Sequence, residues 1–330
     1  MKRGLLILAA FLLIFPIPGT PATGPEPGVA QTSPYTLKPD LSIGVEEGED
    51  DLMFGSISRI DLDGNGNIYI LDYKMRRVVV CDPDGRHMRT IAVPAGQGPR
   101  EATNISGIAV TPGGTLFIND GRKVIVYGPD GEFTRSFKTD FMISSIGCPG
   151  TEELIAIGPK DGRILHVLDK DGKLLESFGE TFAPPSDLLP MKDMPMIGAP
   201  LLFNSSKDGR MFVLNPHKYE VSVFRNRHLE SVLTGKNEHF HPIQRKGNAF
   251  LSTAVHIVAL GETVFVCFQA HPVLHQSPPI AWHKADIFLL GKQVGSIDFP
   301  GTPHVADDRG RIYFAEEEEF PRVVRYTLIN

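Results

Sequence analysis

The stretch that decides the fold is ISRIDLDGNGNIYILDYKMRRVVVCDPDGRHMRTIAV, residues 57–93. An alternating run at residues 57–62 is followed by a turn of Asp, Gly and Asn residues and by a second apolar run at residues 68–71. A third run at residues 78–81 leads into the turn Asp-Pro-Asp-Gly at residues 82–85, and the chain then continues in extended form. The segment therefore predicts four short antiparallel strands joined by tight turns.

This four-stranded unit recurs along the chain. The segment ISGIAVTPGGTLFINDGRKVIVYGPDGEFTRSFK, residues 105–138, repeats the same order of strands and turns. Five of six units carry a glycine in the turn between their first two strands, and Glu153 stands at that place in the third unit; the glycines are Gly66, Gly114, Gly209, Gly261 and Gly310. Their spacing of roughly 40 to 55 residues is typical of propeller repeats.

We therefore predict an all-β fold, a six-bladed beta-propeller of four-stranded antiparallel blades over residues 31–330. The blades are expected near residues 57–93, 105–138, 143–178, 200–233, 254–297 and 302–328. The sixth unit ends after three strands, and the orphan segment YTLKPDLSIGV, residues 35–45, is extended. Because a ring protects its strand edges only when it is closed, we expect this N-terminal strand to join the last blade.

Composition and the N-terminus bound the functional class. The 330 residues carry a net charge of −6, so the chain has no basic surplus for a nucleic-acid backbone. Residues 1–30 begin with Lys2 and Arg3, continue with an apolar run too short to span a bilayer, and end in small residues, which is typical of a signal peptide. We expect an exported monomer, periplasmic or extracellular, that does not contact the membrane after signal cleavage. Its three cysteines are expected to be buried thiols, with one disulfide left open.

Two motifs carry a resemblance to a known family. DGNGNIYILD with RRVVVCDPDG, and the loop GQGPREATNISGIAV that joins the first two units, resemble NHL-type repeats. The chain as a whole is similar to the exported bacterial six-bladed propellers that contain them. The resemblance implies the fold, but related propellers include hydrolases, lyases and binding modules, so it does not choose an activity.

Two acidic patterns are interpreted as structural. Asp61, Asp63, Asn65, Gly66 and Asp72 have the spacing of an EF-hand loop, but an alternating strand follows them where that loop needs a helix. We therefore expect a hairpin turn. The run Glu316–Glu319 is expected to be a solvated turn, since water screens like charges; a basic partner is the alternative.

Histidine supplies the candidate site. Aligning the first strands on Ile60, Ile108, Ile146, Leu202, Ile257 and Val305 places Arg59, His256 and His304 just before the aligned residue in blades one, five and six. First strands line the central channel, so these three residues are predicted to bind a ligand at one mouth. His256 and His304 are the predicted metal ligands. The predicted third ligand comes from His239, His241, His271 or Asp307.

The sequence shows no serine elbow, phosphate loop or HExxH motif. We therefore expect a secreted binding module for an unidentified small-molecule or protein ligand. The alternative is a metal-dependent hydrolase or lyase at the channel mouth, with a divalent metal, zinc or calcium, as its cofactor. The sequence leaves open whether the protein is an enzyme.

Overall fold

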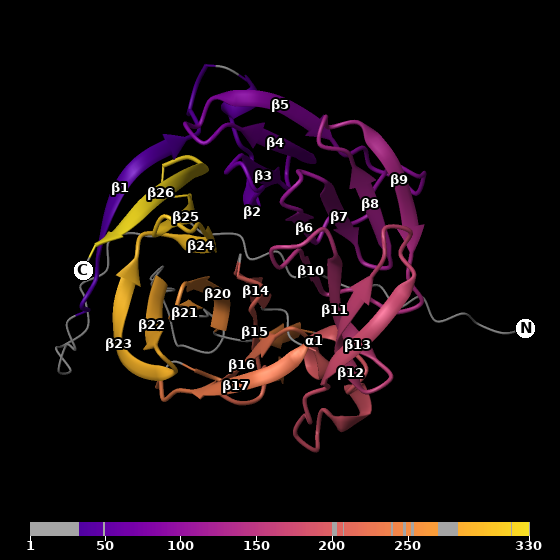
Figure 1. Cartoon of the computed structure of the whole chain (residues 1–330), viewed down its shortest axis with the longest axis vertical. Coiled ribbons are helices and arrows are strands. Elements are labelled where there is room, and N and C mark those ends of the chain that lie inside the picture. The colour runs from indigo at the N-terminus through magenta and orange to yellow at the C-terminus, as the bar shows by residue number, and fades with distance from the viewer. Residues whose placement is uncertain are drawn as a thin grey trace, which may run out of the picture.

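The computed structural model describes residues 33–48, 50–199, 203–206, 208–238, 240–246, 249–251, 254–269, 283–317 and 319–329. These residues form a ring of six sheets around a central axis (Figure 1). The predicted signal peptide lies outside the described residues.

Each sheet has four antiparallel strands in chain order, except the last. The first three blades are β2 (Ile57–Leu62), β3 (Ile68–Asp72), β4 (Arg77–Cys81) and β5 (His87–Ala92); β6 (Gly107–Val110), β7 (Leu116–Asp120), β8 (Lys123–Tyr127) and β9 (Phe133–Lys138); and β10 (Ser145–Gly147), β11 (Leu154–Lys160), β12 (Arg163–Leu168) and β13 (Leu174–Glu180). The next two are β14 (Phe203–Ser205), β15 (Met211–Leu214), β16 (Glu220–Arg225) and β17 (His228–Thr234); and β20 (Ala254–Leu260), β21 (Thr263–Gln269), β22 (His283–Leu289) and β23 (Lys292–Phe299).

The sixth blade is closed by the N-terminal strand, as predicted. Its strands lie in the order β1 (Thr36–Ile43), β26 (Arg322–Ile329), β25 (Arg311–Glu316) and β24 (Thr302–Ala306). The antiparallel register of β1 and β26 runs from Thr36 opposite Ile329 to Ile43 opposite Val323. In Figure 1 the first strand of every blade lies nearest the centre, and β1 takes the perimeter place that β5, β9, β13, β17 and β23 hold in the other blades.

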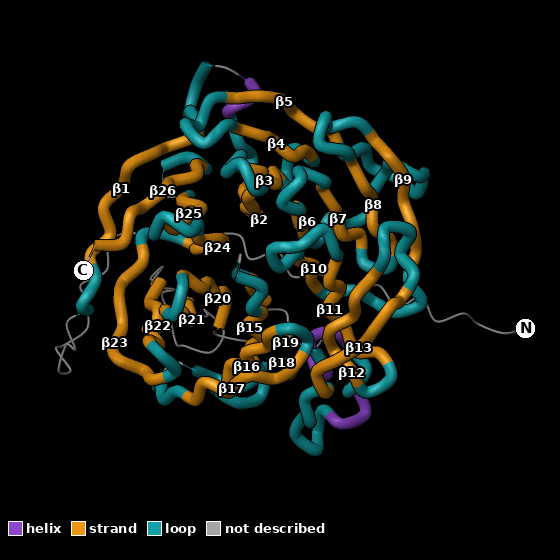
Figure 2. The backbone as a smooth tube through the Cα atoms, viewed as in Figure 1, coloured by secondary structure: helices purple, strands orange, loops and turns teal. Residues whose placement is uncertain are grey.

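Little of the described chain is outside the blades (Figure 2). A hairpin of β18 (Gln244–Lys246) and β19 (Ala249–Leu251) separates blades four and five. Three short helices, η1 (Asp50–Leu52), η2 (Leu189–Met191) and α1 (Pro195–Gly198), lie in connections. No helix in the described ranges is long and apolar enough to cross a membrane.

The hydrophobic core is divided among the six spaces between neighbouring blades. Between blades one and two, for example, Tyr69 and Leu71 of β3 pack with Ile108 of β6 and Ile118 of β7. All five residues of β3 are buried because this strand is covered on both faces. Alternate residues of one strand therefore belong to different interblade layers, which explains why the second strands are apolar without a break.

The acids of the EF-hand-like motif hold backbone turns, as predicted. Asp63 Oδ1 accepts hydrogen bonds from the backbone N–H groups of Asn65 and Asn67, both at 2.9 Å. Asp72 accepts from the backbone N–H groups of Gly55 and Ser56, both at 3.1 Å. These carboxylates therefore fix the hairpin and the chain segment that enters blade one.

The interpretation of the Glu316–Glu319 run as a solvated turn is wrong for its first residue. Glu316 is buried; its Oε2 lies 3.0 Å from Arg322 Nη2, and its Oε1 accepts a hydrogen bond from Tyr326 Oη at 2.7 Å. Glu319 is exposed and lies 3.3 Å from Arg322. The basic partner is therefore Arg322 of β26 in the same blade, whose charge compensates the burial of Glu316.

The three cysteines are free thiols. Cys81 and Cys267 are buried, and Cys148 is partly buried. Burial raises the pKa of the Cys81 thiol to about 12. Such a thiol is protonated at neutral pH and contributes apolar packing.

Candidate functional site

The three residues predicted from the sequence lie on the first strands of their blades, nearest the centre of the ring. The imidazole rings of His256 (β20) and His304 (β24) are in contact, with centroids 4.8 Å apart and an interplanar angle of 74°. Arg59 (β2) extends toward blade four, where its Nη2 donates to the backbone oxygen of Phe203 at 3.5 Å. The structure thus brings the two histidines together across the boundary of blades five and six.

The strand register corrects the alignment that led to this prediction. His256 lies opposite Cys267, as Arg59 lies opposite Leu71, but Val305 lies opposite Tyr313 in the place that Asp61 holds opposite Tyr69. Pro303 lies opposite Phe314, so His304 is the extra residue of an irregularity between Pro303 and Val305, a feature that the alignment did not include.

The alignment was also one residue early in blade four. Phe203 opposite Val213 corresponds to Ile60 opposite Ile70. Because side chains alternate between the faces of a strand, a shift of one residue reverses the direction of a side chain. The irregular pairing at His304 interrupts this alternation in blade six, where the His304 ring contacts that of His256 in the neighbouring blade.

His304 is a buried histidine without a hydrogen-bond partner. The residue is 3% exposed, and neither Nδ1 nor Nε2 has a hydrogen-bond partner among the described residues. Burial, reinforced by the neighbouring His256 and Arg59, holds the pKa of His304 well below its usual value. The ring is therefore neutral, with one N–H donor and one acceptor nitrogen that the described protein atoms leave unused.

Arg59 is partly buried, and burial lowers its pKa while the charge of Asp61 opposes that effect. The Asp61 carboxylate accepts hydrogen bonds from the backbone N–H of Leu62 and of Val110, both at 2.8 Å. Among the described residues Arg59 forms no ion pair within 4.0 Å, so its guanidinium retains unused donors toward the channel.

A small cavity of about 20 Å³ lies beside these groups. Its polar lining comes from three blades: Arg59, Asp61, Asn204, Ser205 and His304. Asn204 fixes the wall, since its Nδ2 donates to the His304 backbone oxygen and its Oδ1 accepts from the Ala259 N–H, both at 3.3 Å. The cavity has room for one water-sized species.

A complete metal site is not assembled by the described residues. They contain no group of three or more His, Cys, Asp or Glu side chains placed to hold one ion. Asp307 is engaged by Arg311, whose Nη2 lies 2.6 Å from its Oδ2. His239 and His271 lie outside the described residues. The metal site at His256 and His304 thus stays a prediction that needs a further ligand.

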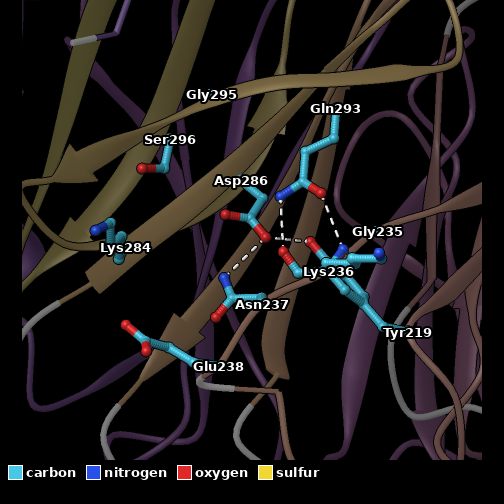
Figure 3. Close-up of a pocket in the computed structure, with 10 residues that line it drawn as sticks. All are labelled: Tyr219, Gly235, Lys236, Asn237, Glu238, Lys284, Asp286, Gln293, Gly295 and Ser296. Atoms are coloured by element: carbon cyan, nitrogen blue, oxygen red, sulfur yellow. Dashed lines mark hydrogen bonds between the residues drawn. The ribbon is translucent and has the colours of Figure 1, made fainter. Parts of the chain in front are cut away.

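Sequence reasoning missed a larger groove between blades four and five. It has a volume of about 660 Å³, and it is lined by the segment that follows β17 and by β22 and β23. Figure 3 shows its lining residues: Tyr219, Gly235, Lys236, Asn237, Glu238, Lys284, Asp286, Gln293, Gly295 and Ser296.

Hydrogen bonds fix the walls of this groove (Figure 3). The buried Asp286 carboxylate accepts from Tyr219 Oη at 2.6 Å and from Asn237 Nδ2 at 2.8 Å. Burial and the Asp286 charge raise the pKa of Tyr219, which keeps this phenol a donor. The Gln293 side chain pairs twice with the Lys236 backbone, accepting from its N–H at 2.9 Å and donating to its oxygen at 3.1 Å.

Aromatic packing supports the groove from below. The Tyr219 ring stacks on Phe240 with centroids 5.2 Å apart, and its edge contacts lie toward Phe268 and Phe288. One local signal of the groove is Asp286, a carboxylate among the apolar residues of β22. A buried charge of this kind needs partners, and here they come from residues 49 and 67 positions away.

The fold and its sites define a six-bladed beta-propeller with a polar groove between two blades. Residues 47–157 match the model of a family described as "DUF5128: 6-bladed beta-propeller". No curated protein matches the chain.

Solved structures share this fold at low sequence identity. A putative exported protein from Bacteroides fragilis has a TM-score of 0.58 and 12% identity, over 91% of this chain and 96% of that one. A member of the DUF4221 family from Bacteroides vulgatus has a TM-score of 0.56 and 11% identity, over 90% and 99%. Virginiamycin B lyase from Staphylococcus aureus has a TM-score of 0.53 and 11% identity, over 89% and 100%. At such identities the similarity concerns the fold.

Proposed function

We propose that the protein is an exported binding module that takes a small polar ligand in the groove between blades four and five. The groove itself carries this proposal: its volume of about 660 Å³ is in the usual range for small-molecule sites, and its walls are pre-organised by hydrogen bonds. A ligand therefore meets fixed donors and acceptors and loses little free energy to ordering of the protein.

The lining favours a polyhydroxylated or amide-bearing molecule. Lys284 is partly exposed and Glu238 is exposed, so charges of both signs border the groove and neither sign dominates. Ser296 is the hydroxyl nucleophile of the lining, and no hydrogen bond joins it to a base in the described chain. Binding without chemistry fits these residues better than acyl transfer does.

The test is a binding assay with defined probes. Saturation-transfer NMR with a panel of mono- and disaccharides and uncharged dipeptides should reveal binding to the wild-type protein. Lys284→Ala and Gln293→Ala should each weaken the Kd about tenfold, as expected for one lost hydrogen bond of about 1.4 kcal/mol. Lys292→Ala, an exposed neighbour outside the lining, is the control. A panel without any binder, or equal affinity in all variants, would overturn the proposal.

Export is a separate part of the proposal. Its support is the basic start and short apolar run of residues 1–30, together with the fold shared with a putative exported protein. Mass spectrometry of protein from the native host should find a mature N-terminus between about residues 20 and 32. An intact Met1 would contradict export.

A second candidate is a metal-dependent hydrolase or lyase at the channel mouth. The contact of the His256 and His304 rings favours it, because two imidazoles in contact can share one ion. Elemental analysis after dialysis against zinc, manganese and calcium tests it directly. Stoichiometric metal that is lost in His304→Ala would support this candidate, and metal-free protein would reject it.

A further inference from the structure

We propose that the centre of the ring binds one small monovalent anion, of the size of chloride or bromide, between Arg59 and His304. The proposal is independent of the groove. It rests on two groups that line the same cavity of about 20 Å³: a guanidinium without an ion pair among the described residues, and a buried imidazole without a hydrogen-bond partner among them.

The unpaired nitrogens of His304 indicate that the cavity holds a hydrogen-bonding species. Both ring nitrogens are buried without a partner, and a buried polar atom left unpaired is strongly destabilising. The cavity holds one monatomic ion or one water, and a larger molecule does not fit. An imidazole ring carries at least one N–H, so the occupant must accept at least one hydrogen bond from His304.

The charge of Arg59 selects an anion. The guanidinium has one long hydrogen bond, to the Phe203 oxygen at 3.5 Å, and no ion pair among the described residues. Asp61, on the same strand, also lines the cavity, and its carboxylate accepts hydrogen bonds from two backbone N–H groups. The charge of Asp61 offsets the burial of this cation only in part, so an anion is favoured over neutral water. A divalent cation would be repelled by the same guanidinium.

Donors from three blades converge on this cavity. Arg59 comes from blade one, His304 from blade six, and Ser205 of blade four adds a hydroxyl that forms no hydrogen bond within the described part of the chain. Asn204 holds the His304 backbone and thus keeps the spacing of the two walls. An anion here would accept hydrogen bonds from strands that are far apart in sequence, and so would stabilise the packing of blades one, four and six around the axis.

The experiment measures the chloride dependence of thermal unfolding. Sodium chloride replaces sodium gluconate from 0 to about 200 mM at constant ionic strength, because gluconate is too large for the cavity. For a Kd of about 10 mM, binding to the folded state alone should raise the Tm by about 3 °C. Arg59→Gln, which keeps an amide and loses the charge, should abolish the shift. Arg309→Gln, at an exposed position of blade six, should retain it.

Bromide supplies a second, structural readout. Crystals grown in sodium bromide should show one anomalous peak within hydrogen-bonding distance of Arg59 and His304, absent in Arg59→Gln. Equal wild-type Tm values in chloride and gluconate, with no bromide peak at the centre, would show that water fills the cavity and would overturn the proposal. A divalent metal found at that place would overturn it as well. Because both readouts compare anions within one protein, a general loss of stability in Arg59→Gln does not obscure the result.

Discussion

Replacing Ile43 by alanine tests how strongly the N-terminal strand closes the ring. Ile43 ends β1 opposite Val323 and is 2% exposed. It packs in the layer between blades six and one, with Ile60 and Ile68. The turn glycine Gly85, whose φ is +83°, approaches it so closely that an added Cβ would lie 3.0 Å from Ile43 Cγ1. The side chain is thus enclosed by β26, by blade one and by a turn that cannot move inward.

The magnitude follows from this enclosure. Removing buried methyl and methylene groups from a site that cannot collapse costs about 2–5 kcal/mol, and we expect about 3 kcal/mol for Ile43→Ala. With an m value of about 3 kcal/mol/M, the urea midpoint should fall by about 1 M. Lys38→Ala, at an exposed position of the same strand, should change the free energy of unfolding by less than about 0.5 kcal/mol.

Urea unfolding followed by far-UV circular dichroism measures both variants against the wild type. A loss below about 0.5 kcal/mol for Ile43→Ala would refute the argument that β1 is an integral part of the core. An equal loss in Lys38→Ala would show that any disturbance of the strand has the same effect, and that the buried contact is not the cause.

Two further changes test buried polar groups elsewhere in the ring. His166 is fully buried, its Nε2 donates to the Gly158 oxygen at 2.8 Å, and burial lowers its pKa below 6.5. The unfolded chain then binds a proton that the folded chain excludes, so stability is retained above pH 6.5 and falls as the pH drops below it. His166→Gln should reduce the slope of unfolding free energy between about pH 6.5 and 5 by up to about 1.4 kcal/mol per pH unit, and an unchanged slope would contradict this assignment. Glu316→Gln should lower the free energy of unfolding in urea by about 1–3 kcal/mol, because it weakens a buried ion pair with Arg322. Replacing the exposed residue, Glu319→Gln, should lower it by less than about 0.5 kcal/mol. Similar losses in the two variants would contradict the argument that the buried ion pair of Glu316 stabilises the blade.

The fold was predictable because its determinants are local and repeated. Alternating strands, Asp and Gly turns and the regular spacing of the units each appear within one segment of sequence. The closing strand was predictable for two reasons. The sixth unit supplies only three strands, and residues 36–43 are an extended segment that no other unit needs as a fourth strand. These features depend on strand period and turn chemistry, which a single sequence displays.

The sites were less accessible because they depend on register and on distant contacts. The contact of His256 with His304 was expected from an alignment that did not include the irregular pairing between Pro303 and Val305, where His304 lies. The groove depends on a hydrogen bond between Tyr219 and Asp286, which are 67 positions apart, and no local sequence pattern predicts such a pair. The burial of Glu316 was not predicted because its partner Arg322 lies on the next strand, and the sequence alone does not show which glutamate of the run pairs with that arginine.

The pairing of β1 with β26 also sets an order of events during synthesis. Ile43 and its partner Val323 are 280 positions apart, so the first strand of the propeller is made long before the strand that receives it. At about 5–20 residues per second, the ribosome needs roughly 15 to 60 s to supply the missing edge. Throughout that interval residues 36–43 are an unpaired strand that other chains can capture. Nascent protein should therefore depend on a chaperone that shields this segment until the last residues emerge.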